Sequence, residues 1–310
     1  MKHVFCNFCD ADDFETLNHG PDLLLNKSGD FYLVRCRQCG LIYQNPQLSS
    51  EELSLHYPND YLPYQLNTTE KQTRLEQVSQ DRAISRFCER ITSKRPQPGR
   101  LLDVGCATGA FLYAMQQQGW RVDGVEPNAH AASQAKQKFD LDIFVGILAE
   151  AAYPSASFDV VTLWDVLEHV TDVKATLTET ARILKPGGLL VFSVPNPASV
   201  EAHLFGANWV GWERPRHLTL IPPKLLSAYL HKTGLELKQI ESFNGRLRLT
   251  LLSIEFVLKA HNIPEQKWRR YLNMAYNMPL RLATWPLYKL GEYFNKTSIM
   301  TVFATRPDRL

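Results

Sequence analysis

The chain of 310 residues has no run of about 18 uncharged apolar residues, the length that a helix needs to cross a bilayer. Its first six residues lack the apolar segment of a secretory signal peptide. Its 34 Lys and Arg nearly balance its 32 Asp and Glu, and a net charge of +2 gives no general case for nucleic-acid binding. We therefore expect a cytoplasmic globular protein, and the 45% of hydrophobic residues fits that class.

Cysteine is scarce but patterned. Four of the six cysteines form two C-x-x-C pairs, Cys6 with Cys9 and Cys36 with Cys39. Without a secretory leader, we expect these thiols to be reduced rather than joined in disulfides. Paired C-x-x-C knuckles are typical of a tetrahedral four-thiolate zinc site, and Gly40 after the second pair suits a knuckle. The alternative is a set of unpaired surface thiols.

The chain before the first strong motif divides into two parts. Residues 1–45 are predicted to form a zinc ribbon, in which the metal supplies much of the folding energy because so small a unit has little core. Residues 46–98 are predicted to be a linker or lid followed by a helix over 69–94. The aromatic stretch 46–68 is either packed on the main domain or forms a lid whose tyrosines, Tyr57, Tyr61 and Tyr64, close over a ligand.

The most informative segment runs from Leu101 to Leu112 with the sequence LLDVGCATGAFL. It is typical of a buried strand that enters a glycine turn and then a helix. A helix N-terminus beside such a turn brings backbone N–H groups close to a ligand. Glu126 ends a second strand about 20 residues later, where a carboxylate can take both hydroxyls of a ribose. We expect a nucleoside-containing cofactor across the carboxyl ends of two parallel strands.

The glycine pattern differs from that of dinucleotide-binding enzymes, which is G-x-G-x-x-G. Here an acid precedes the first glycine, in the order Asp103, Gly105, Gly109. That acid would repel a pyrophosphate and would suit the ammonium group of an amino acid. The pattern resembles the first motif of class I S-adenosylmethionine-dependent methyltransferases. The segments 158–164, 165–170 and 184–194 resemble the later motifs of this family, in the same order and in its small-molecule, quinone-like branch.

The resemblance implies the cofactor contacts. Asp103 would orient the methionine end, the turn residues would let the backbone approach, and Glu126 would hold the ribose. Leu148 would flank adenine and Trp164 would border the methionine moiety. The full set is Asp103, Gly105, Cys106, Gly109, Glu126, Leu148 and Trp164. One position departs from the family, because Ala107 stands where a glycine is usual and its methyl group leaves less room near the cofactor.

Residues 99–310 are predicted to form the methyltransferase domain, of the α/β class with a Rossmann-like seven-stranded sheet. The resemblance places the last strand, 299–305, antiparallel between the fifth and sixth. The segment 245–297 is a helical insertion before that strand. It carries nine Lys and Arg against three Glu, with apolar residues between them. Such a segment either caps the substrate site or a dimer interface, or lies peripherally on the inner face of a membrane.

The acceptor is less constrained. No N-P-P-Y or D-P-P-Y follows the fourth strand, which argues against methylation of a base amino group and favours an oxygen or carbon acceptor. A hydroxyl acceptor benefits from a general base, and the candidates are His169 and His217. In quinone-type relatives a Glu-His pair at the first position helps to hold a divalent metal, and Glu168 with His169 matches it in part. Arg214 and Arg216 are candidates for binding an anionic group of the acceptor.

Our interpretation is a methyltransferase that uses S-adenosylmethionine and structural Zn²⁺ and acts on a hydroxyl of a small-molecule, glycan or lipid-linked acceptor. A zinc-ribbon ribosomal RNA methyltransferase would need a basic ribbon, yet residues 1–45 hold more acids than bases. A sugar C-methyltransferase has a large additional C-terminal domain, for which the 310 residues leave no room. A non-catalytic zinc-binding adaptor would tolerate the loss of Asp103, Gly105 or Glu126, and all three are present.

Overall fold

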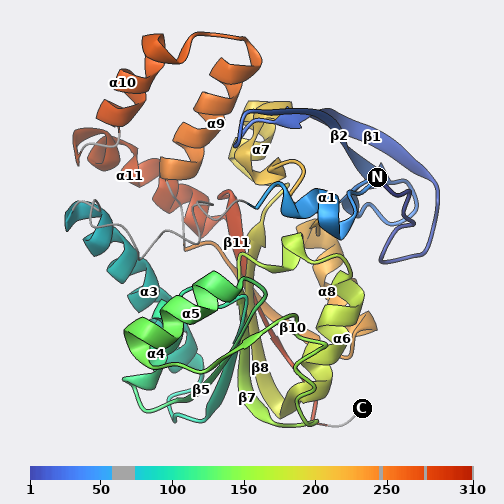
Figure 1. Ribbon diagram of the computed structural model, residues 1–310, viewed down its shortest axis with the longest axis vertical. Coiled ribbons are helices and arrows are strands. Elements are labelled where there is room, and N and C mark those ends of the chain that lie inside the picture. The colour runs from blue at the N-terminus through green and yellow to red at the C-terminus, as the bar shows by residue number, and fades with distance from the viewer. Residues whose placement is uncertain (58–73, 244–246, 276–277, 309–310) are drawn as a thin grey trace.

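The computed structural model describes residues 1–57, 74–243, 247–275 and 278–308, and two β-sheets organise them (Figure 1). The larger sheet has seven strands in the order β10-β11-β8-β7-β4-β5-β6. Its strands are parallel except β11, which pairs antiparallel with both β8 and β10. The strands are β4 (Arg100–Val104), β5 (Arg121–Glu126), β6 (Ile143–Val145), β7 (Phe158–Trp164), β8 (Leu184–Pro195), β10 (Glu236–Glu241) and β11 (Ile299–Thr305).

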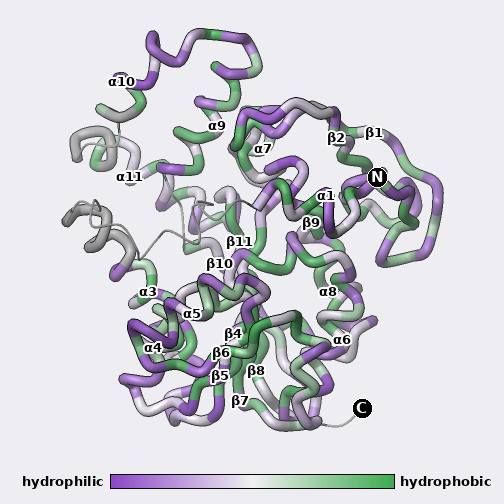
Figure 2. The backbone as a smooth tube through the Cα atoms, viewed as in Figure 1, coloured by the Kyte–Doolittle hydropathy of each residue, from purple (hydrophilic) through white to green (hydrophobic). Residues whose placement is uncertain are grey.

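This topology confirms the expected Rossmann-like sheet, including the antiparallel last strand between the fifth and sixth strands. The helical insertion before that strand is also confirmed. Strand β8 begins at Leu184, which pairs with Phe158 of β7. Figure 2 shows hydrophobic residues concentrated along the central strands of this sheet.

Helices cover both faces of the large sheet. Ile91, Leu112 and Ala135 belong to one buried cluster, which lies under α3, α4 and α5. Leu177 and Leu226 belong to the cluster on the other face, under α6 and α8. The bounds of these helices are α3 (Arg74–Lys94), α4 (Ala110–Gln116), α5 (Ala129–Phe139), α6 (Val173–Ile183) and α8 (Pro223–Lys232).

The N-terminal segment forms a second sheet that it does not complete alone. Its strands are β1 (Phe14–Asp22), β2 (Lys27–Cys36) and β3 (Ile42–Gln44), and the fourth strand is β9 (Thr219–Leu220) from the main domain. Tyr43 pairs with Thr219 and Ile42 with Leu220. Tyr43 also shares a buried cluster with Tyr229 of α8. The small unit expected to have little core of its own therefore borrows both a strand and a core from the rest of the chain.

A short helix, α1 (Ser50–Ser54), follows the second sheet and begins with a capping box between Ser49 and Glu52. The chain is described as far as Tyr57 here. Tyr61 and Tyr64, which we expected in a lid, lie outside the described residues, as does Arg246 of the insertion.

The insertion forms a cap of three helices, α9 (Leu247–Ala260), α10 (Glu265–Ala275) and α11 (Met278–Tyr293). The Thr250 hydroxyl lies 2.7 Å from that of Tyr288, which ties α9 to α11. The N–H of Val210 donates to Ser253 Oγ, so α9 also packs on the segment that follows α7 (Val200–Phe205). Within the described ranges, none of the helices is long and apolar enough to cross a membrane.

A buried ion pair joins β1 of the second sheet to the segment of the main domain that precedes β9. Arg216 donates from its two terminal nitrogens to the two oxygens of Asp22, at 2.7 and 2.8 Å, and neither side chain is exposed. His56 Nδ1 lies 2.7 Å from the same carboxylate. Burial alone would raise the pKa of Asp22, but the hydrogen bonds and charge of Arg216 outweigh it and lower the pKa below its usual value. The pair therefore stays ionised inside the protein.

We expect Asp22→Ala to lower the free energy of unfolding by about 3–5 kcal/mol, because it leaves the buried Arg216 charge without its partner. The measurement is denaturant unfolding of both proteins. Asp13→Ala is the matched control, because Asp13 and Arg37 form an exposed pair whose loss should cost less than about 1 kcal/mol.

Lowering the pH should reduce the difference in unfolding free energy between the wild type and Asp22→Ala. The folded pKa of Asp22 is depressed, so its contribution is complete above the unfolded pKa of about 4 and is lost as the pH falls below it. Equal losses for Asp22→Ala and Asp13→Ala at neutral pH would contradict the role given to the pair.

Candidate functional site

The turn between β4 and α4 can take a ligand close to its backbone. Gly105 has a φ of +72°, and a Cβ there would lie 2.5 Å from a methyl carbon of Val166. Gly109 has a φ of +76° and is the N-cap of α4. A Cβ on Gly109 would lie 2.9 Å from Leu141. Both positions therefore require glycine, one for the contact with the segment after β7 and one for the start of the helix.

Ala107 adopts the left-handed conformation, with a φ of +46°. The expected consequence of this substitution was a loss of room beside the cofactor. The structure shows a different consequence, which is backbone strain, because a residue with a Cβ is disfavoured there by about 1 kcal/mol. Its N–H donates to Glu126 Oε2 at 2.9 Å, a contact that holds the turn in this shape.

Glu126 ends β5 and is 3% exposed. Its second oxygen accepts a hydrogen bond from the N–H of Asn128 at 2.9 Å. Burial raises the pKa of Glu126, and these two backbone N–H groups oppose that rise. Each carboxylate oxygen offers two lone pairs, so the group can accept further hydrogen bonds from a ligand while it holds the turn.

Asp103 lies on β4 beside the same turn and is 3% exposed. The hydroxyl of Thr162 donates to it at 2.6 Å. Burial, with the nearby charge of Glu126, raises the pKa of Asp103 to about 7. A cationic group placed next to this carboxyl would lower the pKa again and keep the group ionised. The site is therefore suited to an ammonium ligand.

The other three predicted cofactor residues have apolar surroundings. Trp164 at the end of β7 stacks on Phe87 of α3, with ring centroids 4.1 Å apart, and meets the edge of Phe111. Leu148 is buried in the main core, whereas Ile147 beside it is 55% exposed. Cys106 is buried as well, and its N–H donates to the carbonyl of Val125.

The two predicted histidines come together. His169 lies in a short 3-10 turn after β7 (Leu167–His169), and His217 precedes β9. Their ring centroids are 4.7 Å apart. Ligand atoms of both rings and of Glu168 all lie within 4.8 Å of one another, which is close enough for one divalent cation. Among the described residues, no group hydrogen-bonds Glu168 Oε2, although that atom is buried.

Hydrogen bonds set the orientation of both rings. Nδ1 of His217 lies 2.8 Å from the carbonyl oxygen of Gly211, and Nδ1 of His169 lies 3.1 Å from that of Arg216. A carbonyl only accepts, so each Nδ1 carries the proton and each lone pair is on Nε2. Nε2 of His217 lies 3.7 Å from Glu213.

Burial determines the charge of this cluster. It lowers the pKa of His169, helped by His217, to about 3, and it lowers the pKa of His217. Burial and the neighbouring carboxylates of Asp165 and Glu213 raise the pKa of Glu168 well above its ordinary value. At neutral pH the two histidines are therefore uncharged bases.

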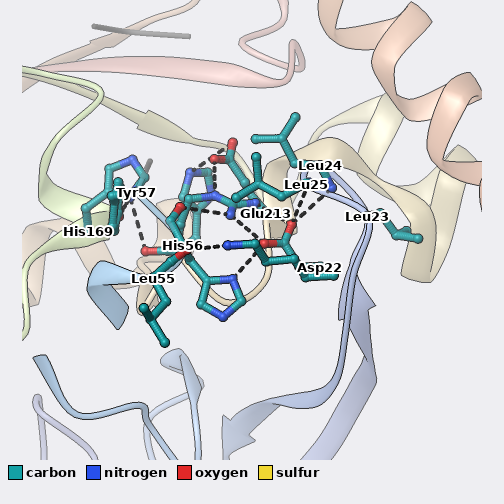
Figure 3. A network of polar contacts seen from close by, with 12 residues as sticks. Asp22, Leu23, Leu24, Leu25, Leu55, His56, Tyr57, His169 and Glu213 are labelled. Carbon is teal, nitrogen blue, oxygen red and sulfur yellow. Dashed lines mark hydrogen bonds and ion pairs between the residues drawn. The ribbon is translucent and has the colours of Figure 1, made fainter. Parts of the chain in front are cut away.

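Asp22, His56 and Glu213 lie in one network of polar contacts (Figure 3). Arg216 pairs with Asp22 in this network, and its carbonyl contacts His169. Arg216 Nε donates to Glu213 at 2.9 Å. Figure 3 also shows Tyr57, whose hydroxyl lies 2.9 Å from Nδ1 of His169. Motif reasoning did not identify Asp22 as part of this site, because its partner Arg216 comes from a distant part of the chain. It also missed Glu213, although its partners Arg216 and His217 follow within four residues.

The arginines do not face an acceptor as expected. Arg216 is fully buried and engaged with Asp22 and Glu213. Arg214 is 6% exposed and donates to Asn18 Oδ1 and the carbonyl of Ala207. Both side chains bind the protein itself, so they hold the N-terminal sheet against the main domain.

The four N-terminal cysteines form a cluster at the end of β2, and Cys6 and Cys36 share a buried cluster with Tyr229 of α8. Their sulfur atoms all lie within 4.8 Å of one another. The two knuckles match: the N–H of Asp10 donates to the carbonyl of Cys6, and that of Gly40 to the carbonyl of Cys36. Asp10 and Gly40 both have a positive φ, of +61° and +83°. This donor set and spacing fit a tetrahedral metal with sulfur ligands at about 2.3 Å.

Comparison with known proteins places these features in a family. The family model described as a methyltransferase domain matches residues 75–240. The ubiquinone biosynthesis O-methyltransferase of Xanthomonas axonopodis pv. citri is 31% identical over 172 residues, which cover 50% of this chain and 72% of that relative. The protein of the same name from Saccharophagus degradans is 34% identical over 185 residues, which cover 53% of this chain and 78% of that relative.

A solved structure shares the fold. The (4+2)-cyclase SpnF superimposes with a TM-score of 0.54 and 18% identity, over 84% of this chain and 97% of that one. At that identity the likeness concerns the fold alone. The matched domain, the curated relatives and the glycine turn with its two acids agree: the chain belongs to the methyltransferase domain family and is an S-adenosylmethionine-dependent methyltransferase.

Proposed function

We propose that this enzyme methylates a hydroxyl oxygen of a small-molecule, glycan or lipid-linked acceptor. The observation that carries the proposal is the position of the uncharged histidine pair. Val166 contacts Gly105 of the cofactor turn, and Glu168 and His169 follow Val166 in the same short segment. The N–H of Leu218 donates to the carbonyl of Glu168 and brings His217 to the same place. The relatives named O-methyltransferases support an oxygen acceptor.

The residues of the turn fit the cofactor. Bound S-adenosylmethionine supplies an electrophilic methyl group on a sulfonium, and methyl transfer from it is a direct displacement. Glu126 would accept hydrogen bonds from the ribose hydroxyls, and Asp103 would face the ammonium of the methionine end. Trp164, held by Phe87, would border the methionine moiety and exclude water from the reacting atoms. These residues align the reactants rather than take part in a covalent step.

The histidines act on the acceptor. As the acceptor oxygen forms its bond to the methyl carbon, its proton passes to Nε2 of His217 or His169. Glu213, 3.7 Å from Nε2 of His217, would stabilise the resulting imidazolium. Positioned bases of this kind contribute roughly 10²–10⁴-fold to a rate. The Tyr57 hydroxyl contacts Nδ1 of His169 and leaves Nε2 to the acceptor, which gives the 46–57 segment a part in the site.

The same cluster fits a divalent cation. Glu168 and the two histidines supply one carboxylate and two imidazoles within reach of a single cation. Glu168 Oε2 is buried without a hydrogen bond from the described residues, so the carboxylate has an oxygen left to bind a ligand. With a cation bound there, these residues would hold it, and its charge would lower the pKa of the acceptor hydroxyl. In that case the histidines act as ligands and not as bases.

We also propose that the four-cysteine cluster binds structural Zn²⁺. The matched knuckles and the sulfur spacing support this assignment. The metal would fix the end of the second sheet, whose opposite edge carries β9 and the segment with His217.

Glu126→Gln should weaken the binding of S-adenosylhomocysteine about 100-fold, because the amide cannot replace two charge-assisted hydrogen bonds to the ribose. Isothermal titration calorimetry measures the change. Asp142→Asn is the control, because Asp142 is 90% exposed and paired with Lys136 at the surface. Unchanged affinity of Glu126→Gln would remove this residue from the cofactor site.

We expect the purified wild type to carry one zinc ion and Cys36→Ser to lose it, because three thiolates and a hydroxyl bind zinc far more weakly than four thiolates. Metal content per chain is measured by mass spectrometry of the elements. Cys88→Ser is the control, since Cys88 is buried outside the cluster. Stoichiometric zinc in Cys36→Ser would refute the four-cysteine site.

Methyl transfer from labelled S-adenosylmethionine should yield O-methyl products when the enzyme is offered phenols, sugar hydroxyls and amines in parallel. With the acceptor found, His217→Gln should lower kcat by about 100-fold or more. The pKa values of both histidines are depressed, so both stay unprotonated below pH 6.5, where an ordinary histidine gains a proton. The wild-type rate should therefore not fall as the pH is lowered through 6.5.

Products methylated only on nitrogen would overturn the proposal. If a chelator abolishes activity and Mg²⁺ restores it, the bound divalent cation, and not a histidine base, activates the acceptor hydroxyl. Glu168→Gln distinguishes the two directly, because it should abolish the response to Mg²⁺ and spare proton transfer by the histidines.

A further inference from the structure

Helix α11 exposes its apolar residues and buries its less apolar ones. Where its side chains are described, the face turned to the protein carries Thr284, Tyr288 and Glu292. The exposed surface of the helix carries large apolar side chains with 57–80% of their area accessible, namely Leu282, Trp285, Leu287, Leu290 and Tyr293. This is the reverse of a helix that packs its apolar stripe on a core. The helix therefore presents an apolar surface to something outside the chain.

The exposed apolar surface continues beyond α11. The N–H of Val200 donates to the carbonyl of Lys296, so the start of α7 lies beside the end of the cap. Val200 and Leu204 of α7 are 60% and 71% exposed, and Phe294 is 60% exposed. On α10, Tyr271 and Met274 are exposed as well. Nine of the 18 exposed large apolar side chains in the described part of the chain lie between Ile263 and Phe294, so the surface is local to the cap.

The cap is also basic. Residues 245–297 hold nine Lys and Arg and three Glu, which gives this segment a charge of +6. The whole chain has a net charge of +2, so the remaining residues carry −4. All three glutamates form ion pairs within the cap, Glu255 with Lys259, Glu265 with Arg269 and Glu292 with Lys289. Lys267, Arg270 and Lys296 are exposed among the apolar residues. A partner of the cap must therefore be both apolar and negatively charged.

We propose that the cap docks on an anionic lipid surface, with the apolar residues of α11 and α7 entering the interface and the basic residues at the headgroups. Long cationic side chains reach the headgroups while their stems lie on apolar surface. Each basic residue near such a surface adds to the attraction, whereas the acidic remainder of the chain does not. A second copy of the chain fits less well, because a twofold contact would bring two caps of charge +6 together.

The cap lies at the end of the large sheet from which β8 leads into α7, the end at which the cofactor turn also lies (Figure 1). A lipid-linked acceptor at the membrane would thus meet the enzyme on the side of its site. The access of a lipid-linked acceptor rests on the proposed function. Docking of the cap does not, and docking can be measured without an acceptor or methyl transfer.

The test is flotation of the full-length protein with vesicles of phosphatidylcholine alone and of phosphatidylcholine mixed with anionic phosphatidylglycerol. Wild type should bind the anionic vesicles and lose binding at high salt, where charge attraction is screened. The double variant Trp285→Glu with Leu290→Glu should bind at least about tenfold more weakly. Phe5→Glu is the matched control, because Phe5 is 60% exposed in the N-terminal segment, outside the cap, and should leave binding unchanged.

Several results would overturn the proposal. One is wild-type protein that does not float with the anionic vesicles. Another is a double variant that floats with them as well as Phe5→Glu does. A concentration-dependent dimer in light scattering that the double variant abolishes would assign the surface to a second copy instead. Calorimetry with S-adenosylhomocysteine verifies folding of every variant, and if the double variant fails that check, Val200→Glu with Leu204→Glu replaces it. Cofactor binding that is retained while vesicle binding is absent would refute docking and leave the methyltransferase assignment standing.

Discussion

The buried pair of Asp22 and Arg216 connects the N-terminal sheet to the segment of the main domain that carries His217. Asp22 ends a strand of the second sheet, and Arg216 precedes His217 directly. The carbonyl of Arg216 also orients the ring of His169. Two charges taken out of water stay ionised only because each has the other at bidentate distance. The position of the histidine pair therefore depends on an ion pair whose two members come from different parts of the chain.

The parts that the sequence analysis predicted are the parts that local patterns determine. The seven strands of the large sheet follow short apolar runs, and their order follows from the family motifs. The glycine turn and its acids, Asp103 and Glu126, lie within about two dozen residues of one another, so their spacing carries the signal. The cysteine pairs are equally local, and each knuckle closes on its own backbone hydrogen bond.

The parts that were missed depend on contacts between distant residues. Strand β9 has two residues and no sequence signal, and it exists because β3 offers it an edge. The role expected for Arg216 was wrong because its acidic partner lies 194 residues away. The strain at Ala107 was taken for a loss of room, because a residue type does not reveal a positive φ. Which acceptor the histidines serve is a property of the ligand, and no residue pattern in the chain specifies it.

The two-residue strand β9 has a consequence for how the protein is made. A ribosome releases the cysteine pairs and the hairpin of β1 and β2 early in synthesis, yet the edge strand and the arginine that complete their sheet come from beyond residue 213. Local contacts form before distant ones, since closing a long loop costs entropy first. The N-terminal hairpin must therefore wait with an open strand edge while most of the methyltransferase sheet is synthesised. A metal ion held by the four thiolates in that interval would act as a clamp during synthesis, before it acts as part of the finished structure.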